Sequence, residues 1–279
     1  MVKADMHIHS TSSDGIFSPQ EIIAWALRKN LGAISITDHD TINGFFKALK
    51  YITENDVNIV LVPGVELSCM YSDYEVHLLG YCFDYKSSYL KNVLDDIRFK
   101  RINRAKEMID KLNDLDIDIS LDDIKKKCNE DTSIGRPHIA RELRDKGYVK
   151  DTDEAFNKYL NEGGCAFVPR YKLSLKDGID LIHNDGGVAV LAHPGLLKIN
   201  YVNLIDKFDF DGIEIYHPKN DKYTRNELLH ITKRKKMLIT GGSDFHDMYV
   251  NDIPMIGDYN VDIESKCRIE NNVCVAIKK

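Results

Sequence analysis

Histidine side chains recur at the ends of short apolar runs in this sequence. The first run ends in HIHS, where His7 and His9 fall on the same side of a strand because side chains alternate along it. Two imidazoles that converge at a strand end suit zinc, manganese or iron. The chemistry indicated by these residues is that of a divalent transition metal.

Carboxylates accompany the histidines where the later runs end, in SSDG, TDHD, GVELS and GGSDFH. The candidate metal ligands are, in chain order, His7, His9, Asp14, His39, Glu66, His77, His193, Asp244 and His246. These are too many ligands for one ion of tetrahedral or octahedral preference. We therefore predict a polynuclear metal site.

Each pattern taken alone also has a structural interpretation. A lone strand histidine such as His77 is more often a packed, hydrogen-bonded side chain, and TDHD or GGSDFH could be a turn that caps a helix. The recurrence of histidine with carboxylate at successive strand ends favours the metal interpretation. Four other histidines lack this pattern: His138, His183, His217 and His230. For His183 and His230, which lie in predicted helices, we expect a structural role.

Strands and helices are expected to alternate along most of the chain. Runs typical of strands span residues 2–10, 33–38, 58–69, 75–84, 187–194, 212–217 and 237–246. Helical patterns span residues 18–30, 43–55, 174–186, 203–208 and 225–236. The first helix has a capping box, with Ser18 as cap, Pro19 in the first turn and Glu21 opposite. The alternation predicts an α/β fold with parallel strands and crossover helices, in an irregular barrel.

A highly charged helical stretch interrupts this alternation from about Ser87 to Tyr171. It includes LKNVLDDIRFKRINRAKEMIDKLNDL and contains no convincing run typical of a strand. We therefore predict an α/β domain formed by residues 1–86 and 172–279. Residues 87–171 are predicted to form a helical insertion domain packed over one face of it.

Composition and charge narrow the classes of function. The net charge of −6 argues against a surface that grips duplex DNA, although bound cations would reverse the sign locally for a small anionic substrate. The six cysteines include no CxxC pair, which argues against a thiolate zinc site and fits reduced thiols. With no signal-peptide pattern and no apolar run of about 20 residues, we expect a cytoplasmic protein without a membrane span.

HIHS, TDHD, the strand-end glutamate, AHP and SDFH occur in this order and resemble the polymerase and histidinol phosphatase (PHP) superfamily. The resemblance covers residues 1–86 and about 172–246. It implies a distorted (β/α)7 barrel with two to three divalent ions (manganese, zinc or iron) at the carboxyl ends of the strands. One ion would be held by His7, His9, Glu66 and Asp244, a second by Glu66, His77 and His193, and a third by Asp14, His39 and His246. Asp38 and Asp40 would orient His39 or neighbouring ligands.

The insertion is similar to one branch of this superfamily, the nucleoside 3′,5′-bisphosphate phosphatases, which includes 5′→3′ exonucleases acting on short RNA. The similarity lies in IGRPHIARELRDKGYV and YLNEGGCAFVPRY. It implies that Arg136 and His138 hold phosphate, with Arg170 assisting. GRPH could instead be a helix start with a structural arginine. Phe167 departs from the branch, where a tyrosine is expected.

The activity implied is hydrolysis of nucleotide phosphomonoesters by a hydroxide that bridges two metal ions, with the leaving group metal-bound or protonated by His138 or water. The partner would be a small nucleotide or short RNA. Two alternatives are a histidinol-phosphate phosphatase and a non-catalytic PHP module. The oligomeric state stays open.

Overall fold

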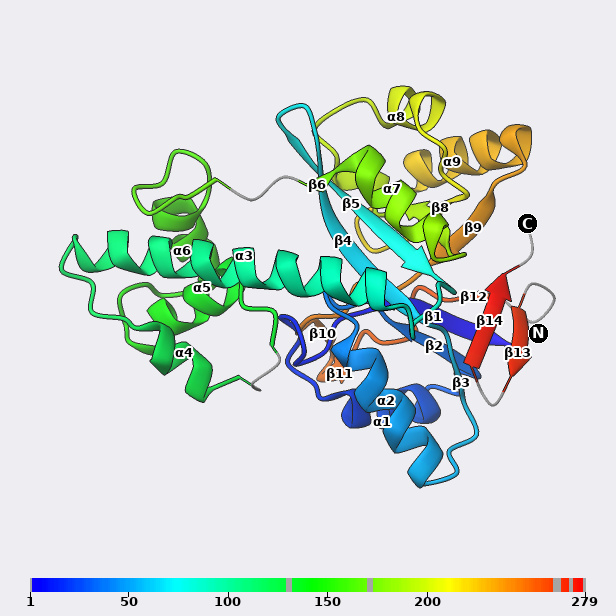
Figure 1. Cartoon of the computed structure of the whole chain (residues 1–279), viewed down its shortest axis with the longest axis horizontal. Coiled ribbons are helices and arrows are strands. Elements are labelled where there is room, and N and C mark those ends of the chain that lie inside the picture. Colours follow the sequence, from blue (N-terminus) through cyan, green and yellow to red (C-terminus); the bar gives the residue numbers. More distant parts are fainter. Residues whose placement is uncertain (1, 129–131, 170–172, 263–266, 271–272, 278–279) are drawn as a thin grey trace.

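The computed structural model describes residues 2–128, 132–169, 173–262, 267–270 and 273–277. It contains an α/β body and a group of helices, α3 to α6, that projects to one side of the body (Figure 1). Among the described residues, no helix combines the length and apolar character that crossing a membrane requires.

Two sheets form the α/β body. The strands of the first sheet are β1 (Lys3–Ile8), β2 (Ala33–Ile36), β3 (Val60–Leu61), β12 (Val261–Asp262), β13 (Cys267–Glu270) and β14 (Val273–Ile277), in the order β12-β1-β2-β3-β14-β13. The strands of the second are β4 (Gly64–Tyr71), β5 (Tyr74–Tyr81), β6 (Leu173–Ser174), β7 (Val188–Leu191), β8 (Gly212–Tyr216) and β9 (Leu238–Gly241), in the order β6-β4-β5-β7-β8-β9. A separate hairpin pairs β10 (Tyr249–Val250) with β11 (Ile253–Pro254).

Two isolated parallel bridges join the sheets, one between Ile8 and Phe245 and one between His39 and Glu66. Through these bridges the strands β1, β2, β4, β5, β7, β8 and β9 follow one another around a common centre. This order agrees with the predicted seven-stranded α/β barrel. The hydrogen-bonded ladder is interrupted at both junctions, which is where the candidate ligands gather.

The strands of this ring are not all parallel. β1 and β2 are parallel, as are β7, β8 and β9, but β5 is antiparallel to both β4 and β7. The prediction of parallel strands is therefore wrong at β5. Only Ser72 and Asp73 separate the paired residues Tyr71 and Tyr74, and so short a connection can only reverse the chain.

Helices cover the outer faces of the sheets, as the alternation predicted. They are α1 (Pro19–Arg28), α2 (Asn43–Glu54), α7 (Leu175–Asn184), α8 (Tyr201–Lys207) and α9 (Lys222–Lys235). The short 3₁₀ helix η2 (Pro194–Leu196) instead directly follows His193 after β7. The predicted capping box of α1 is present: Ser18 Oγ accepts from the Glu21 amide at 3.3 Å, and Glu21 Oε2 accepts from the Ser18 amide at 2.8 Å. The caps fix where each helix leaves the loop that precedes it.

The projecting helices are α3 (Ser88–Asn113), α4 (Leu121–Lys126), α5 (Arg136–Asp145), α6 (Thr152–Ala155) and the π-helix η1 (Phe156–Leu160). The described residues between 87 and 169 contain no strand, as the sequence predicted. One apolar cluster is formed entirely by residues of this region, among them Leu112, Leu143 and Leu160. Leu90 and Leu94 of α3 instead pack into the core of the body. We retain 87–171 as a proposed insertion domain that shares α3 with the body.

Candidate metal centre and active site

Four candidate ligands meet at the end of β1. The Nε2 atoms of His7 and His9 lie 3.1 Å apart. Both lie 3.3 Å from Oδ1 of Asp244, and they lie 3.5 Å and 3.2 Å from the two carboxylate oxygens of Glu66. All four side chains are largely shielded from solvent. The strand alternation that predicted a common side for the two histidines is thus confirmed.

Glu66 faces five histidines with its two oxygens. Besides His7 and His9, its Oε1 lies 2.9 Å from His77 Nδ1 and 3.0 Å from His193 Nε2, and its Oε2 lies 2.9 Å from His39 Nδ1. The side chain is 1% exposed. A buried carboxylate shared among so many imidazoles can serve as a bridging ligand between neighbouring ions.

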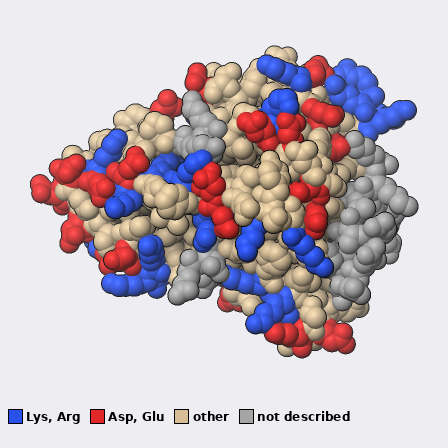
Figure 2. All heavy atoms as spheres, in the orientation of Figure 1, with Lys and Arg blue, Asp and Glu red and all other residues tan. Residues whose placement is uncertain are grey.

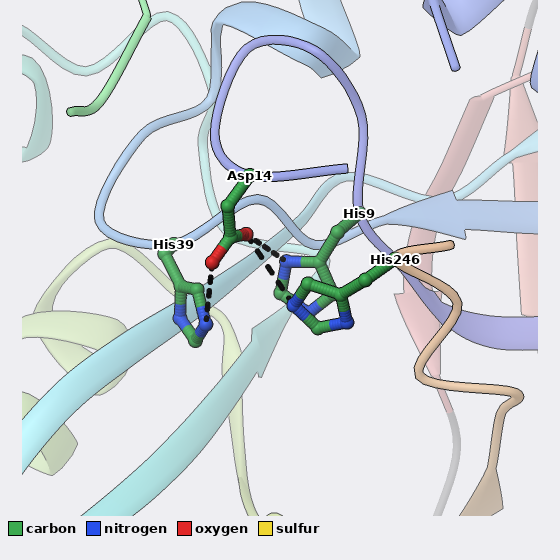
Figure 3. A group of neighbouring side chains, drawn as sticks. All are labelled: His9, Asp14, His39 and His246. Carbon is green, nitrogen blue, oxygen red and sulfur yellow. Dashed lines mark ion pairs between the residues drawn. The ribbon is translucent and has the colours of Figure 1, made fainter. Parts of the chain in front are cut away.

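The third group of ligands surrounds Asp14, as Figure 3 shows. Asp14 Oδ1 lies 3.3 Å from His246 Nε2 and 3.7 Å from His9 Nδ1, and Oδ2 lies 3.9 Å from His39 Nε2. The ligand atoms of these four residues all lie within 4.8 Å of one another. The structure therefore brings together the predicted Asp14, His39 and His246, and adds His9 to them.

Burial and charge show that this cluster fits divalent cations. Asp14 Oδ1, His39 Nδ1 and Glu66 Oε2 are buried and make no hydrogen bond. His39 Nδ1 and Glu66 Oε2 are only 2.9 Å apart, and both atoms face the interior of the cluster. An unsatisfied buried polar atom costs about 1–3 kcal/mol. A cation coordinated by these atoms would remove that cost.

The protonation states of Glu66 and His39 also suit the binding of a divalent cation. Burial favours a neutral Glu66, but His39, His77 and His7 outweigh it and hold the pKa of this carboxyl well below its usual value. Burial lowers the pKa of His39 to about 4 despite the nearby Glu66 and Asp14. The carboxylate is thus charged and the imidazole neutral at pH 7, which are the forms that bind metals.

Comparison with known proteins identifies the family. The model of the PHP domain matches residues 5–160, which is more than half of the chain. The chain belongs to the PHP family.

Relatives of this PHP protein act on phosphoesters. A 5′–3′ exoribonuclease of Haemophilus influenzae is 34% identical over 252 residues, which cover 88% of this chain and 90% of the relative. A 3′,5′-nucleoside bisphosphate phosphatase of Chromobacterium violaceum is 32% identical over 253 residues, 88% of each protein. The family and these relatives, with the cluster of candidate metal ligands, show that the chain is a metal-dependent phosphoesterase.

Solved structures share the fold. An amidohydrolase from Chromobacterium violaceum, with bound sulfate and no metal, has a TM-score of 0.81 at 30% identity and covers 93% of this chain and 91% of its own. A protein from Bifidobacterium adolescentis, named as a metal-dependent phosphoesterase, has a TM-score of 0.79 at 29% identity, with 92% and 93% covered.

Asp38 and Asp40, predicted to support the PHP centre, hold the loops around it. Asp38 accepts from the Ser10 amide at 2.7 Å and from Ser13 Oγ at 2.6 Å, and thereby fixes the loop between His9 and Asp14. Asp40 accepts from the Ser68 amide on β4 at 2.8 Å and forms a buried ion pair with Arg101 of α3. These contacts set where the ligand-bearing segments lie.

Two buried residues of the centre were missed at the sequence level. Glu214 on β8 lies 2.9 Å from His7 Nδ1, and its other oxygen accepts from the His193 amide at 2.8 Å. His217 Nε2 lies 3.1 Å from Asp244 Oδ2. Leaving His217 outside the pattern was wrong: it ends a strand and precedes a proline, as His193 does. The signal for Glu214 was a lone acid in the apolar run GIEIY.

His183, expected to be structural, lies outside the centre, and its Nε2 lies 2.7 Å from Asp211 Oδ2.

The predicted substrate residues occupy the start of α5. Arg136 Nη2 lies 3.6 Å from Glu75 Oε2, and its Nη1 lies 3.4 Å from Asn161 Oδ1. His138 Nδ1 accepts from the Gly135 amide at 3.1 Å, and burial lowers its pKa to about 4. His138 is therefore neutral at pH 7. Arg170 lies outside the described residues.

The insertion also braces the loop that carries Asp14. Arg141 of α5 donates to the Asp14 carbonyl oxygen, and the Ser133 amide donates to the Ser12 carbonyl at 2.9 Å. The departure at Phe167 is a packing contact here, with the Arg104 guanidinium 6.0 Å from the ring centre. The insertion thus contributes to the site through its backbone contacts as well as through its charged side chains.

Proposed function

We propose that the chain removes the 3′-phosphate of nucleoside 3′,5′-bisphosphates, with the 5′ ends of short RNA as a further substrate class. The observation that carries this proposal is the position of Arg136. Its guanidinium pairs with Glu75, and Glu75 Oε1 lies 3.1 Å from Nε2 of the candidate ligand His77. In this proposal a guanidinium that shares one carboxylate with a candidate ligand holds one phosphate of a substrate while the other reaches the centre.

The proposal places two to three ions of manganese, zinc or iron in the cluster. Three overlapping sets of residues offer ligand atoms: His7, His9 and Glu66; His39, Glu66 and His77; and His9, Asp14, His39 and His246. Bound there, the ions would make water a nucleophile near neutral pH and would neutralise charge on the phosphoryl group. His193 and Asp244 complete the set, since each contacts a member of it.

The chain's own residues orient the substrate. Arg136 offers paired donors that match two phosphate oxygens, and Arg170 supplies a further cation. His138 is neutral and buried, so in this proposal it holds phosphate or the leaving oxygen by a hydrogen bond. The backbone of the loop from Ser10 to Asp14 is fixed by Asp38, which keeps Asp14 in place during turnover.

Named activities of the relatives and the charge pattern both support a small substrate. The exoribonuclease and the bisphosphate phosphatase act on RNA and nucleotides, and the sulfate in the structure from Chromobacterium violaceum has the shape of phosphate. Positive and negative side chains are interspersed over the face in Figure 2, with no continuous positive band suited to duplex DNA. A cytoplasmic location also belongs to this proposal, since the described cysteines are free thiols.

A substrate panel tests the proposal. The purified protein is assayed with adenosine 3′,5′-bisphosphate, a short 5′-phosphorylated RNA and histidinol phosphate, each with manganese, zinc, iron and magnesium in turn. We expect turnover of the bisphosphate to exceed that of histidinol phosphate. Preference for histidinol phosphate would replace the proposed substrate, and turnover of the RNA alone would make the chain an exoribonuclease only.

A further inference from the structure

We propose that Glu75 is a positioning residue that couples phosphate binding at Arg136 to the metal ligand His77. The inference rests on the proposed function. Each oxygen of the Glu75 carboxylate faces a different part of the molecule. Oε2 lies 3.6 Å from Arg136 Nη2 at the start of α5, and Oε1 lies 3.1 Å from His77 Nε2 on β5.

The contacts continue into the metal centre. Nδ1 of His77 lies 2.9 Å from Glu66 Oε1, so the two ring nitrogens of His77 face two different carboxylates. Exposure rises outward along this series: Glu66 is 1% exposed, His77 22%, and Glu75 35%. Arg136, which contacts Glu75, is less exposed, at 25%, and can still be reached by a substrate.

The β4–β5 hairpin makes this arrangement rigid. Glu75 and His77 are two residues apart on β5 and therefore lie on the same face of the sheet. His77 pairs with Ser68 across the hairpin, and Glu75 pairs with Met70. The backbone ladder fixes the Cβ atoms of both residues on one face of the sheet, so Glu75 stays within reach of His77 whichever partner its other oxygen has.

A carboxylate on the outer nitrogen of a ligand histidine fixes the orientation of the ring and raises its basicity, which strengthens the metal bond. The ion pair with Arg136 partly neutralises the same carboxylate, so Glu75 acts less strongly on His77. When an anionic phosphate binds Arg136, it competes with Glu75 for the guanidinium, and more of the Glu75 charge is left for His77. Phosphate binding therefore tightens the metal site, and by thermodynamic linkage a filled metal site favours phosphate at Arg136.

Metal affinity, measured without turnover, tests the role of Glu75. Zn²⁺ is titrated from the purified holoprotein into a chromophoric chelator, for the wild type and for Glu75→Gln. The change removes the charge at nearly constant volume, and we expect affinity to fall at least about tenfold. Asp73→Asn is the matched control, since it removes the same charge from the same hairpin and should leave affinity unchanged. Equal affinities for Glu75→Gln and the wild type would overturn the inference.

The coupling itself is tested with Arg136→Gln in both backgrounds. We expect it to tighten Zn²⁺ binding severalfold when Glu75 is present and to have no effect beside Glu75→Gln. Equal tightening in both backgrounds would reflect simple repulsion between the guanidinium and the ions, and would overturn the coupling. If Glu75→Gln fails to fold, Glu75→Asp, which keeps the charge but shortens its reach, takes its place with the same expected loss. A wild type that holds no metal would overturn the proposed function instead.

Discussion

Glu214 and His7 form a buried contact of 2.9 Å between a carboxylate oxygen and Nδ1. The other nitrogen of His7 faces His9, Glu66 and Asp244, so the ring is fixed between a supporting carboxylate on β8 and the ligand cluster. Glu214 also accepts from the His193 amide at 2.8 Å. One side chain therefore holds the ring of His7 and the backbone of His193, two candidate ligands that lie far apart in the sequence.

We predict that Glu214→Gln weakens metal binding about 10–100-fold. Loss of the negative charge reduces the basicity of His7, and the glutamine fixes the orientation of the His7 ring less firmly. Inductively coupled plasma analysis after dialysis against a weak chelator would measure retained metal. Glu54→Gln, an exposed acid on α2, is the control. Unchanged retention in Glu214→Gln would make this carboxylate a packing residue.

Alanine at His7, Glu66 or Asp244 should abolish turnover while the fold survives. These side chains lie at strand ends, where barrels place chemistry, and each contacts several other candidate ligands. We expect circular dichroism spectra like that of the wild type and activity at least about 100-fold lower, in line with the loss of a charge-stabilising group. A variant that keeps near-normal turnover would take its residue out of the active site.

Metal affinity should rise with pH. Burial favours the neutral form of His77, but Glu66 and Glu75 outweigh it and raise its pKa to about 10 in the metal-free protein. Asp14 and Asp244 likewise raise the pKa of His246 to about 10. Below that pH both rings are positively charged, with a proton on each ring nitrogen. One of these protons must leave before the ring can bind metal, so metal binding releases protons. Calorimetry of Zn²⁺ binding in buffers of different ionisation enthalpy at pH 7 would count them. No proton release would contradict the ligand role of both rings.

Chelation should destabilise the protein. A ligand present at 100 times its Kd stabilises the native state by about 2.7 kcal/mol. With an unfolding entropy of about 2.1 cal/mol/K per residue, such a change moves Tm by about 5 °C in a chain of 279 residues. Differential scanning fluorimetry with and without a chelator measures the shift, and added manganese or zinc should reverse it. An unchanged Tm would mean that the purified protein binds no metal ion that stabilises its folded state.

Arg136→Lys should lower activity although it keeps the positive charge, because lysine cannot reproduce the paired donors of a guanidinium. Loss of a charged hydrogen bond to phosphate costs about 1.5–3 kcal/mol, or roughly ten- to more than hundredfold in kcat/KM. Metal content under saturating metal should be unchanged. The loss should be larger for a nucleoside 3′,5′-bisphosphate than for an aryl phosphate. Equal losses would confine Arg136 to the reacting phosphate, and no loss would make GRPH a structural helix start.

The candidate ligands could be predicted from sequence because their signals are local. Alternation along a strand put His7 and His9 together, and a strand-end position singled out His39 and His193. Glu214 and His217 show where local signals fail. A glutamate between two isoleucines is recognised as a site residue only once β8 is known to face His7.

Contacts between segments that are distant in the sequence could not be predicted for the same reason. The pairing of Arg136 with Glu75 depends on how α5 lies against the β4–β5 hairpin, and no periodicity encodes that. The antiparallel direction of β5 follows from the two-residue turn at Ser72 and Asp73, and the short polar connection between the predicted strands 58–69 and 75–84 was not recognised as a hairpin turn. The last strands, β13 and β14, were not predicted, although the run VCVAI at residues 273–277 is of a type common in strands.

The two bridges that join the sheets have a consequence for biosynthesis. Ile8 pairs with Phe245, so β1 finds this partner only after the segment that carries Phe245 has left the ribosome. The early ligands, from His7 to His77, emerge before the insertion, whereas His193, Asp244 and His246 emerge after it. A nascent chain can therefore hold a metal ion only through an incomplete set of ligands. The full set of candidate ligands is assembled only when the segments that carry His193, Asp244 and His246 have joined the fold.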